Sequence, residues 1–372
     1  MTDDYPEEGR PVFTFVKNIV DALANNGNDC TVIAPFSITR HKKFHKTYET
    51  YTASNGNIVK VYRPNIFTIS NWNIMGFSPT AYAFRNAVSR VLKKLEQKPD
   101  VIYGHFWRNA LYAYKYAQRN NIPLFVATGE SVININNSDE KLDNFANYVS
   151  GVICVSSKNK DESIEKGLTI SEKCRVIPNA INPSVFYKMD KQECRRKLGI
   201  DAEKFISITV GAFIHRKGTL RVSSAIDKIS DDVYSIFIGH GPDVPNRKNI
   251  LFCGRVDNKE LPVYLNAADV FVLPTLHEGC CNAILEAMAC GLPIISSNSS
   301  FNWDILNETN SILINPNDVD EIAQAIKLLK DDSQLRNSLS KGALEEASKH
   351  TLHNRAIRIE NFIDDKIIHN NI

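Results

Sequence analysis

The sequence HEGCCNAILEAMACGLP (277–293) follows the apolar run DVFVLPT (269–275), and together these two stretches decide the fold. The first has the length and composition of a buried strand, and the second predicts a short helix that Gly291 and Pro293 end. A strand that leads through a loop into a helix is the repeating unit of parallel α/β sheets. The spacing places Glu278 in the loop and Glu286 in the helix.

The same alternation continues on both sides of this unit. Further strands are expected at 205–213, 234–241, 249–256 and 292–298 in the second half, and at 30–35, 57–64, 99–106, 123–130 and 149–157 in the first. Helical patterns lie between them, such as 80–98, and three more close the chain at 319–330, 333–350 and 352–368. The pattern predicts an α/β protein with two Rossmann-like domains that face a cleft.

Three segments are expected. Residues 1–182 and 183–350 would form the two domains, and residues 351–372 a helix that crosses back to the first domain. The first domain lacks its usual opening strand, because only ten mostly polar residues precede the first expected helix at 11–25. Either another segment supplies that strand or the start is truncated. We expect the codons just upstream to encode about five apolar residues.

The composition excludes several classes of protein. The 44 Lys and Arg against 42 Asp and Glu give a net charge of +2, too small to attract nucleic acid. The eight cysteines include no CxxC pair, which indicates reduced thiols of a cytoplasmic protein. The acidic start MTDDYPEEGR lacks the apolar core of a signal peptide, and no apolar run is long enough for a membrane span.

The loop around Glu278 has the features of a site for an anion and a sugar. A helix start beside Gly279 offers free backbone N–H groups to an anion, and no side chain blocks close approach. Carboxylates beside a phosphate site suit sugar hydroxyls, since one carboxylate accepts both hydrogens of a vicinal diol. The alternative interpretation is that Glu278 and Glu286 are ordinary surface residues near the start of a helix.

This segment resembles the two-glutamate signature of the large retaining glycosyltransferase family 4, also called glycosyl transferases group 1, and the likeness extends over nearly the whole chain. The resemblance implies a GT-B fold, in which residues 1–182 form the acceptor-binding domain and residues 183–350 the nucleotide-sugar-binding domain. It also implies that Glu278 contacts the donor sugar and that Glu286 contacts the ribose. Asn282 resembles the residue that stands at this position in members that use UDP-linked hexoses or N-acetylhexosamines. This resemblance favours a UDP-linked donor over a GDP-linked one. The donor-binding residues it implies in this loop are Gly279, Cys280, Cys281 and Asn282.

A second segment, VGAFIHRKG (210–218), resembles the diphosphate loop of the family, in which a lysine neutralises the leaving group. Lys217 matches that lysine. Ala212 stands where many members have an arginine, and Arg216 is the candidate substitute. Other donor contacts implied by the resemblance are Gly211, Gly239 in GHGP, and Gly254, Arg255 and Val256 in CGRV.

The first half departs further from the family pattern. PEEGRP (6–11) resembles a phosphate loop with two glycines, but here Gly9 is followed by Arg10, which either contacts phosphate or is solvated. Glu130 stands where many relatives have a catalytic histidine. His105, at the end of an expected strand, is the other candidate, although strand-end histidines are often structural.

No catalytic metal and no cofactor is expected. The only Asp-x-Asp triplet, 318–320, opens a helix and is explained by capping. One basic stretch, TRHKKFHK (39–46), either is a solvated loop or holds the protein on the inner face of the cell membrane. Its cations are Arg40, Lys42, Lys43 and Lys46.

The sequence therefore predicts a retaining transferase that moves a hexose or N-acetylhexosamine from a nucleotide diphosphate donor to a glycan or lipid-linked acceptor. Surface polysaccharide or glycoconjugate synthesis is the expected setting. Two alternatives remain open at this point: a nucleotide-sugar epimerase of the same architecture, and a catalytically inactive binding subunit. Ala212, Glu130 and the missing first strand favour the second alternative.

Overall fold

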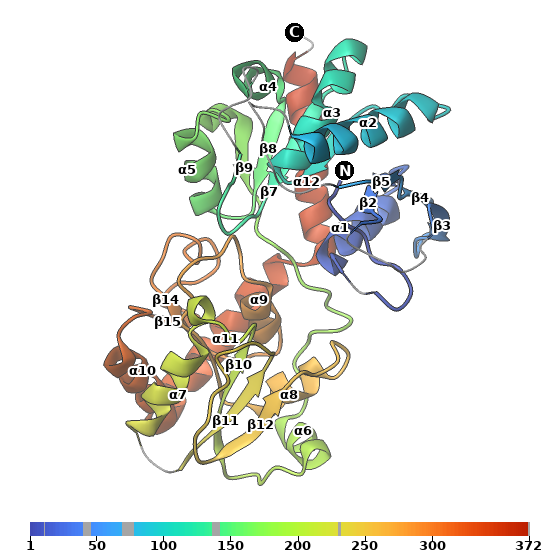
Figure 1. Cartoon of the computed structure of the whole chain (residues 1–372). Coiled ribbons are helices and arrows are strands. Elements are labelled where there is room, and N and C mark those ends of the chain that lie inside the picture. The colour runs from blue at the N-terminus through green and yellow to red at the C-terminus, as the bar shows by residue number, and fades with distance from the viewer. Residues whose placement is uncertain (11, 40–45, 69–77, 136–141, 230–231, 371–372) are drawn as a thin grey trace. The chain divides into compact units, whose positions relative to one another are not determined.

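The computed structural model describes residues 1–10, 12–39, 46–68, 78–135, 142–229 and 232–370 (Figure 1). The chain forms two compact units. Unit 1 comprises Met1–Ile177 and Leu352–Ile372, and unit 2 comprises Pro178–Thr351. Each unit is built on parallel strands with helices packed against them, as the alternation in the sequence predicted. The units divide between Ile177 and Pro178, five residues before the expected boundary at 182.

Within its described residues, unit 2 contains one sheet of parallel strands in the order β12-β11-β10-β13-β14-β15. Its central pair is in register from Phe205↔Val233 to Val210↔Ile238. The sequence analysis did not identify the edge strand β15. The strands are β10 (Phe205–Val210), β11 (Val233–Ile238), β12 (Ile250–Gly254), β13 (Val270–Leu273), β14 (Ile294–Ser297) and β15 (Ser311–Ile314).

Helices cover both faces of this sheet. α7 and α10 pack together over a core that contains Val222, Phe237 and Ile326, whereas α8 and α9 contact the sheet from the other side. The helices of unit 2 are α6 (Lys191–Leu198), α7 (Thr219–Asp227), α8 (Leu261–Ala267), α9 (Asn282–Ala289), α10 (Val319–Asp331) and α11 (Ser333–Lys349), with a 3-10 turn, η2 (His215–Lys217).

Within the described residues, unit 1 contains three sheets, in the orders β1-β4-β3, β2-β5 and β6-β7-β8-β9. β3 pairs antiparallel with β4, from Tyr48↔Tyr62 to Thr52↔Ile58, and this hairpin was not expected. The strands are β1 (Thr31–Ile33), β2 (Phe36–Ser37), β3 (Tyr48–Thr52), β4 (Ile58–Tyr62), β5 (Asn65–Ile66), β6 (Ile102–His105), β7 (Leu124–Thr128), β8 (Gly151–Cys154) and β9 (Cys174–Val176).

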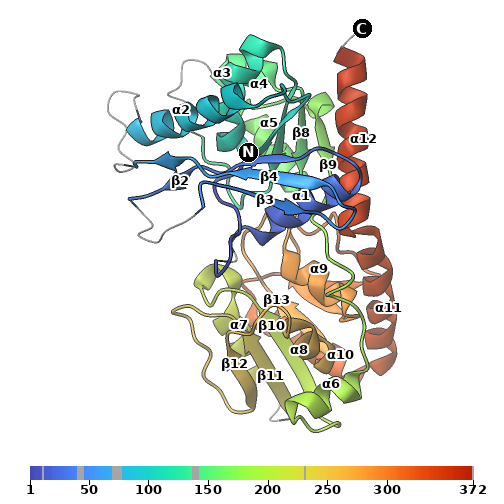
Figure 2. The same ribbon diagram turned by 90° about the vertical axis from the view of Figure 1, so that its right-hand side faces the viewer.

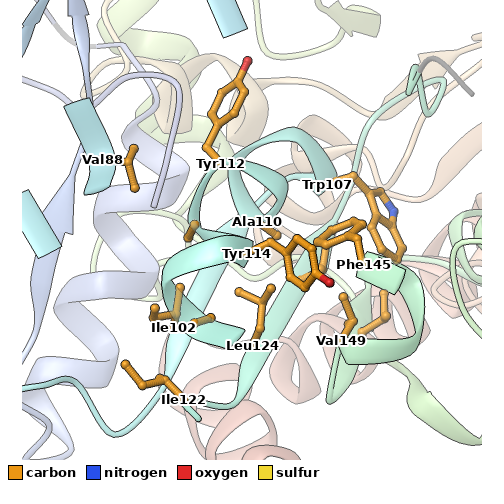
Figure 3. Packing of buried hydrophobic residues seen from close by; sticks show 14 of the residues in the cluster. Val88, Ile102, Trp107, Ala110, Tyr112, Tyr114, Ile122, Leu124, Phe145 and Val149 are labelled. Atoms are coloured by element: carbon orange, nitrogen blue, oxygen red, sulfur yellow. The ribbon is translucent and has the colours of Figure 1, made fainter. Parts of the chain in front are cut away.

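Two apolar cores lie on opposite faces of the β6–β9 sheet. On one face, α2, α3 and α4 pack through Val88, Trp107 and Phe145, respectively (Figure 3). On the other, α1 and the C-terminal helix α12 pack on the strands and on each other (Figure 2). The helices are α1 (Thr14–Asn25), α2 (Pro79–Lys94), α3 (Trp107–Asn120), α4 (Leu142–Tyr148), α5 (Ser157–Glu165) and α12 (Leu352–Asn370), with a 3-10 turn, η1 (Ser171–Lys173).

The first two residues lie between the edge strands β1 and β6. The Met1 ammonium donates to the carbonyl of Tyr103 (2.9 Å), and the N–H of His105 donates to the carbonyl of Met1 (2.7 Å). On the other side, the N–H of Thr2 donates to the carbonyl of Ile33 (3.1 Å). One residue bonded to two residues that are two positions apart is the pattern of a parallel ladder.

Candidate active site

In unit 2, Glu278 lies at the centre of a cluster of hydrogen-bond donors. Its Oε1 atom accepts from Nη1 of Arg216 (2.7 Å) and from the hydroxyl of Thr275 (3.1 Å), and it also forms an ion pair with Nζ of Lys217. The side chains of Glu278 and Lys217 are each 13% exposed, against 34% for Arg216. The structure thus brings together the three residues of unit 2 that the sequence analysis placed in catalysis.

Two strand-end loops hold this cluster. One follows β10 and contains η2, and the other joins β13 to α9. The N–H of Leu276 donates to the carbonyl of Arg216 (2.9 Å), and Arg221 donates to the carbonyl of Pro274 (2.8 Å). Because β10 and β13 are adjacent parallel strands, the loops at their carboxyl ends meet at one edge of the sheet.

Lys217 keeps its charge in this site. Burial alone would lower its pKa, but negative charge on Cys281, when that thiol is ionised, and on the carboxylate of Glu278 outweighs that effect, and the pKa lies above its ordinary value. Burial also raises the pKa of the Cys281 thiol. At neutral pH the loop therefore presents a cationic lysine beside an uncharged thiol, an arrangement suited to an anionic ligand.

The start of α9 provides further donors. No side-chain hydrogen bond caps the helix at Cys281, and the N–H of Ile284 donates to the carbonyl of Cys281 (3.2 Å), so at most the N–H groups of Asn282 and Ala283 remain for an anion. The side chain of Asn179 donates to the carbonyl of Cys280 (3.0 Å) and fixes the loop just before the helix. Gly279 and Cys280 are buried, while Asn282 is partly exposed on the first turn.

Glu286 lies on α9, one to two turns after that helix start, as the sequence predicted. Burial raises the pKa of its carboxyl to about 7. A carboxyl group that titrates near neutral pH can accept hydrogen bonds from two hydroxyl groups when ionised, but loses part of that capacity when it is protonated.

The remaining donor candidates lie on neighbouring strand ends of the same sheet. The N–H of Gly211 donates to the carbonyl of Ile238, and that of Gly239 to the carbonyl of Gly254 (2.8 Å). A Cβ atom at Gly239 would lie 1.8 Å from the carbonyl oxygen of Gly211, so only glycine permits this approach. Arg255 is exposed and Val256 partly exposed after β12.

In unit 1, Arg10 is paired within its own loop. Its guanidinium donates to both carboxylate oxygens of Asp4, at 3.1 Å to Oδ1, and to Glu7 (3.4 Å), in a tight turn in which Gly9 has φ 73°. The charge of Arg10 is thus already compensated locally. A phosphate contact by Arg10 would require exchange of these partners, a constraint that the sequence did not reveal.

The carboxylate of Glu130 is held by three donors of unit 1. It accepts from the hydroxyl of Thr128 (2.6 Å), from the N–H of Gly129 (2.9 Å) and from the N–H of Trp107 at the start of α3 (3.3 Å). Burial raises its pKa, and these hydrogen bonds oppose the rise. Glu130 therefore joins the end of β7 to the first turn of α3.

His105 is buried at the end of β6 among aromatic rings, with Phe106 and Phe15 at 5.1 and 5.5 Å between ring centres. Burial, together with the positive charges of Arg355 and the N-terminus, lowers the pKa of its imidazole to about 3. The ring is therefore neutral at physiological pH and cannot deliver a proton as an imidazolium.

Other expectations concern metals and membranes. Asp318 caps α10 by accepting from the N–H groups of Asp320 and Glu321, as predicted for the Asp-x-Asp triplet. In the described part of the chain, no group of three or more His, Cys, Asp or Glu side chains is placed to hold a metal ion. Of the basic stretch 39–46, only Thr39 and Lys46 are among the described residues, and both are exposed. None of the described helices is both long and apolar enough to cross a membrane.

The sequence analysis did not identify Thr275 or Arg221 as site residues. Thr275 bonds the carboxylate of Glu278, and Arg221 ties the two loops together through backbone carbonyls. The position of Thr275 at the carboxyl end of an apolar strand is the one signal that could have found it. Nothing in the local sequence indicates the contact of Arg221, because its partner is far away along the chain.

Comparison with known proteins agrees with this geometry. Residues 12–185 match the family model for Glycosyltransferase Family 4, and residues 190–346 match the model for glycosyl transferases group 1. The chain belongs to this glycosyltransferase family. The family resemblance inferred from the two glutamates and from Lys217 is thus confirmed, and this glycosyltransferase is an enzyme.

Two curated relatives of this glycosyltransferase are similar over most of its length. The putative teichuronic acid biosynthesis glycosyltransferase TuaC of Bacillus subtilis is 28% identical over 88% of this chain and 87% of its own. UDP-Gal:alpha-D-GlcNAc-diphosphoundecaprenol alpha-1,3-galactosyltransferase of Escherichia coli is 29% identical over 68% of this chain and 71% of its own.

Solved structures show the fold of the glycosyltransferase to be GT-B. Sucrose-phosphate synthase from Thermosynechococcus elongatus superposes with a TM-score of 0.77 at 18% identity, over 99% of this chain and 95% of that one. Anabaena HepE, solved in complex with UDP and glucose, superposes with a TM-score of 0.72 at 18% identity, over 98% of each chain.

Proposed function

We propose that this glycosyltransferase transfers a hexose or N-acetylhexosamine from a UDP-sugar to a glycan or lipid-linked acceptor, with retention of the anomeric configuration. The observation that carries the proposal is the cluster of Glu278 with Lys217 and Arg216 beside the uncapped start of α9. It combines a carboxylate for sugar hydroxyls with cations and backbone amides for a diphosphate. The relatives named above for teichuronic acid synthesis and for UDP-galactose support polysaccharide or glycoconjugate synthesis as the setting.

In the proposed mechanism, the protein accelerates the reaction mainly by stabilising the departing diphosphate. As the bond from the anomeric carbon to the diphosphate breaks, the diphosphate leaves with the electron pair. Lys217, Arg216 and the first-turn amides of α9 would stabilise the charge that develops on its oxygens. With the donor bound, the diphosphate would take over hydrogen bonds that the two cations now give to Glu278, and the carboxylate would turn to the sugar.

The acceptor hydroxyl attacks the anomeric carbon from the face that the diphosphate leaves, and a diphosphate oxygen takes its proton. This step requires no protein nucleophile. A double displacement would require a carboxylate under the anomeric carbon. Glu130 is the candidate for it in unit 1, but its carboxylate bonds three internal donors. We therefore assign Glu130 to positioning, and His105, buried and neutral, to the same kind of role.

A thermal-shift screen against UDP, GDP and their sugars tests the donor class. A ligand at about 100 times its dissociation constant adds about 2.7 kcal/mol of apparent stability, which is readily measured as a rise in melting temperature. UDP and UDP-sugars should raise it more than the GDP series. A protein that converts a donor into its epimer without an acceptor, or that binds without turnover, would contradict the proposed transfer.

The titration of Glu286 predicts the pH dependence of nucleotide binding. Its pKa of about 7 lies above the ordinary value, so the ionised form that accepts both ribose hydroxyl hydrogens prevails only above neutral pH. UDP affinity should therefore fall as pH decreases from 8 to 6. Calorimetry on Glu286→Gln should show weaker UDP binding at pH 8 than in the parent protein, and a smaller loss of UDP affinity between pH 8 and pH 6. Some loss should remain, because the phosphate of UDP titrates in the same way with both proteins. Equal pH profiles would contradict the ribose assignment.

Activity should survive chelation. The one Asp-x-Asp triplet of the sequence is used in a helix cap, where Asp318 accepts two backbone hydrogen bonds and Asp320 pairs with Lys228. We expect turnover in saturating EDTA to stay within about twofold of the untreated rate, because Lys217 and the α9 amides supply the charge stabilisation. Loss of turnover that magnesium or manganese restores would refute this expectation.

A further inference from the structure

Arg221 is a residue of unit 2 that reaches both loops of the candidate active site. It lies in the first turn of α7, and its guanidinium group donates two hydrogen bonds to backbone carbonyls, from Nη1 to His215 (2.9 Å) and from Nη2 to Pro274 (2.8 Å). His215 lies two residues before Lys217, and Pro274 lies four residues before Glu278. One side chain therefore links the main chain near Lys217 to the main chain near Glu278.

The local backbone is shaped around this guanidinium group. Gly218, just after η2, has φ 78°, and a Cβ atom there would lie 2.7 Å from Nη2 of Arg221 and 2.8 Å from the carbonyl oxygen of Pro274. A side chain at this position would therefore push the guanidinium group away from its second carbonyl. Arginine suits the role because its planar fork holds several N–H donors at fixed angles, whereas a lysine ammonium is a point charge on a flexible stem.

Stability alone does not explain this arrangement. The Nε atom of Arg221 is buried and has no hydrogen-bond partner among the described residues. An unsatisfied buried donor costs stability. Burial also lowers the pKa of the guanidinium group, an effect that the negative charge of Asp243 opposes. A partly unsatisfied arginine that spans two loops is expected where the geometry of those loops serves function.

The hydrogen bonds of Arg221 would outlast donor binding. In the structure, the ion pairs of Glu278 with Lys217 and Arg216 also link the two loops. The proposed mechanism transfers these cations to the diphosphate, so the ion pairs would no longer hold the loops together. The bonds of Arg221 go to backbone carbonyls, which take no part in that exchange. Together with the bond from the N–H of Leu276 to the carbonyl of Arg216 (2.9 Å), they would fix the loops while the donor reacts.

We propose that Arg221 is a positioning residue for sugar transfer. It holds Lys217 and Glu278 at the spacing at which the cation meets the diphosphate and the carboxylate meets the sugar of the same donor. This inference rests on the proposed function, and in it Arg221 acts through the other two residues without contact with the donor. Because a displacement of a catalytic group by about 1 Å can cost about a hundredfold in rate, loss of this link should be visible in turnover.

The first test compares Arg221→Met with Arg336→Met. Arg336 in α11 is also partly exposed and also donates to two backbone carbonyls, those of Leu329 (2.5 Å) and Lys330 (3.1 Å), but it lies outside the proposed site. The two variants should lower the melting temperature by similar amounts. Only Arg221→Met should lower kcat, by about tenfold or more, with the donor KM and the affinity for free UDP within about threefold of the parent. An unchanged kcat, or an equal loss in both variants, would overturn the proposal.

The conservative variant Arg221→Lys separates the geometry of the fork from its charge. Lysine keeps the positive charge but does not reproduce the planar pair of donors. Its kcat should therefore stay at least about threefold below that of the parent. Full recovery would show that charge alone is sufficient and would overturn the positioning role. If Arg221→Met does not fold, this variant and Arg336→Lys carry the same comparison.

A double-mutant cycle shows whether Arg221 acts through Lys217. In a Lys217→Met background, Arg221→Met should cost about twofold or less in kcat, because the cation that it positions is already gone. The full tenfold cost in that background would overturn the proposal. If Lys217→Met and Glu278→Gln each leave turnover unchanged, the proposed function itself fails. If both lower turnover and Arg221→Met does not, only the positioning role fails.

Discussion

Replacement of Glu278 by glutamine is expected to lower turnover by about a hundredfold or more while free UDP binds almost as before. The transferred sugar gains positive charge as the diphosphate leaves, so a carboxylate beside it is worth more in the transition state than in the ground state. Glutamine keeps the shape and one acceptor oxygen but removes the charge. Steady-state kinetics with the full donor and calorimetry with UDP alone measure the two quantities on the same samples.

The matched control for this variant is Glu346→Gln in α11, outside the proposed site. Glu346 also bonds two basic side chains, Lys349 and His350, both at 2.9 Å. Its replacement should leave turnover unchanged, which separates loss of catalysis from general loss of an ion pair. If Glu278→Gln loses UDP affinity while Glu286→Gln keeps it, the assignment of the two glutamates is reversed. If neither variant changes either quantity, the interpretation of the motif fails.

The sequence predicted the Glu278 loop and α9 because their signals are local. An apolar strand, a glycine in the loop and a stop at Gly291 and Pro293 place both glutamates without any tertiary information. The cap at Asp318 was predicted for the same reason, since its partners lie two and three residues further on. The three-way hydrogen bonding of Glu278 was beyond prediction, since it joins two loops about sixty residues apart.

The first half of the chain was harder to predict for physical reasons. β3 has the sequence YETYT, in which every residue is exposed or partly exposed, so no apolar run marks it as a strand even though its hairpin partner β4 follows directly in the chain. The pairing of Arg10 with Asp4 shows the same limit, because an arginine beside a glycine is equally consistent with phosphate binding. The cavity that β1 and β6 line in unit 1 was not predictable either, because its lining residues come from segments far apart in the sequence.

Lys217→Met is expected to have the second large effect, a loss of about a hundredfold to a thousandfold in turnover. Methionine keeps much of the apolar stem but removes the cation that would meet the departing diphosphate. Unlike Glu278→Gln, this variant should also bind free UDP more weakly, because UDP, the nucleotide product, carries the same diphosphate charge. Lys217→Arg retains the charge and should recover part of both losses, although the bulkier guanidinium does not reproduce a point charge.

Arg216→Met provides the graded comparison. Arg216 is 34% exposed and Lys217 only 13%, so water and salt screen the arginine more strongly. Its loss should cost about tenfold or less in turnover, and that cost should shrink further in 0.5 M salt, whereas the Lys217→Met loss should change little. Melting temperatures of both variants should remain near that of the parent, since Glu278 keeps one cationic partner in each. A larger loss for Arg216→Met than for Lys217→Met would show that Arg216 is the principal cation for the leaving group.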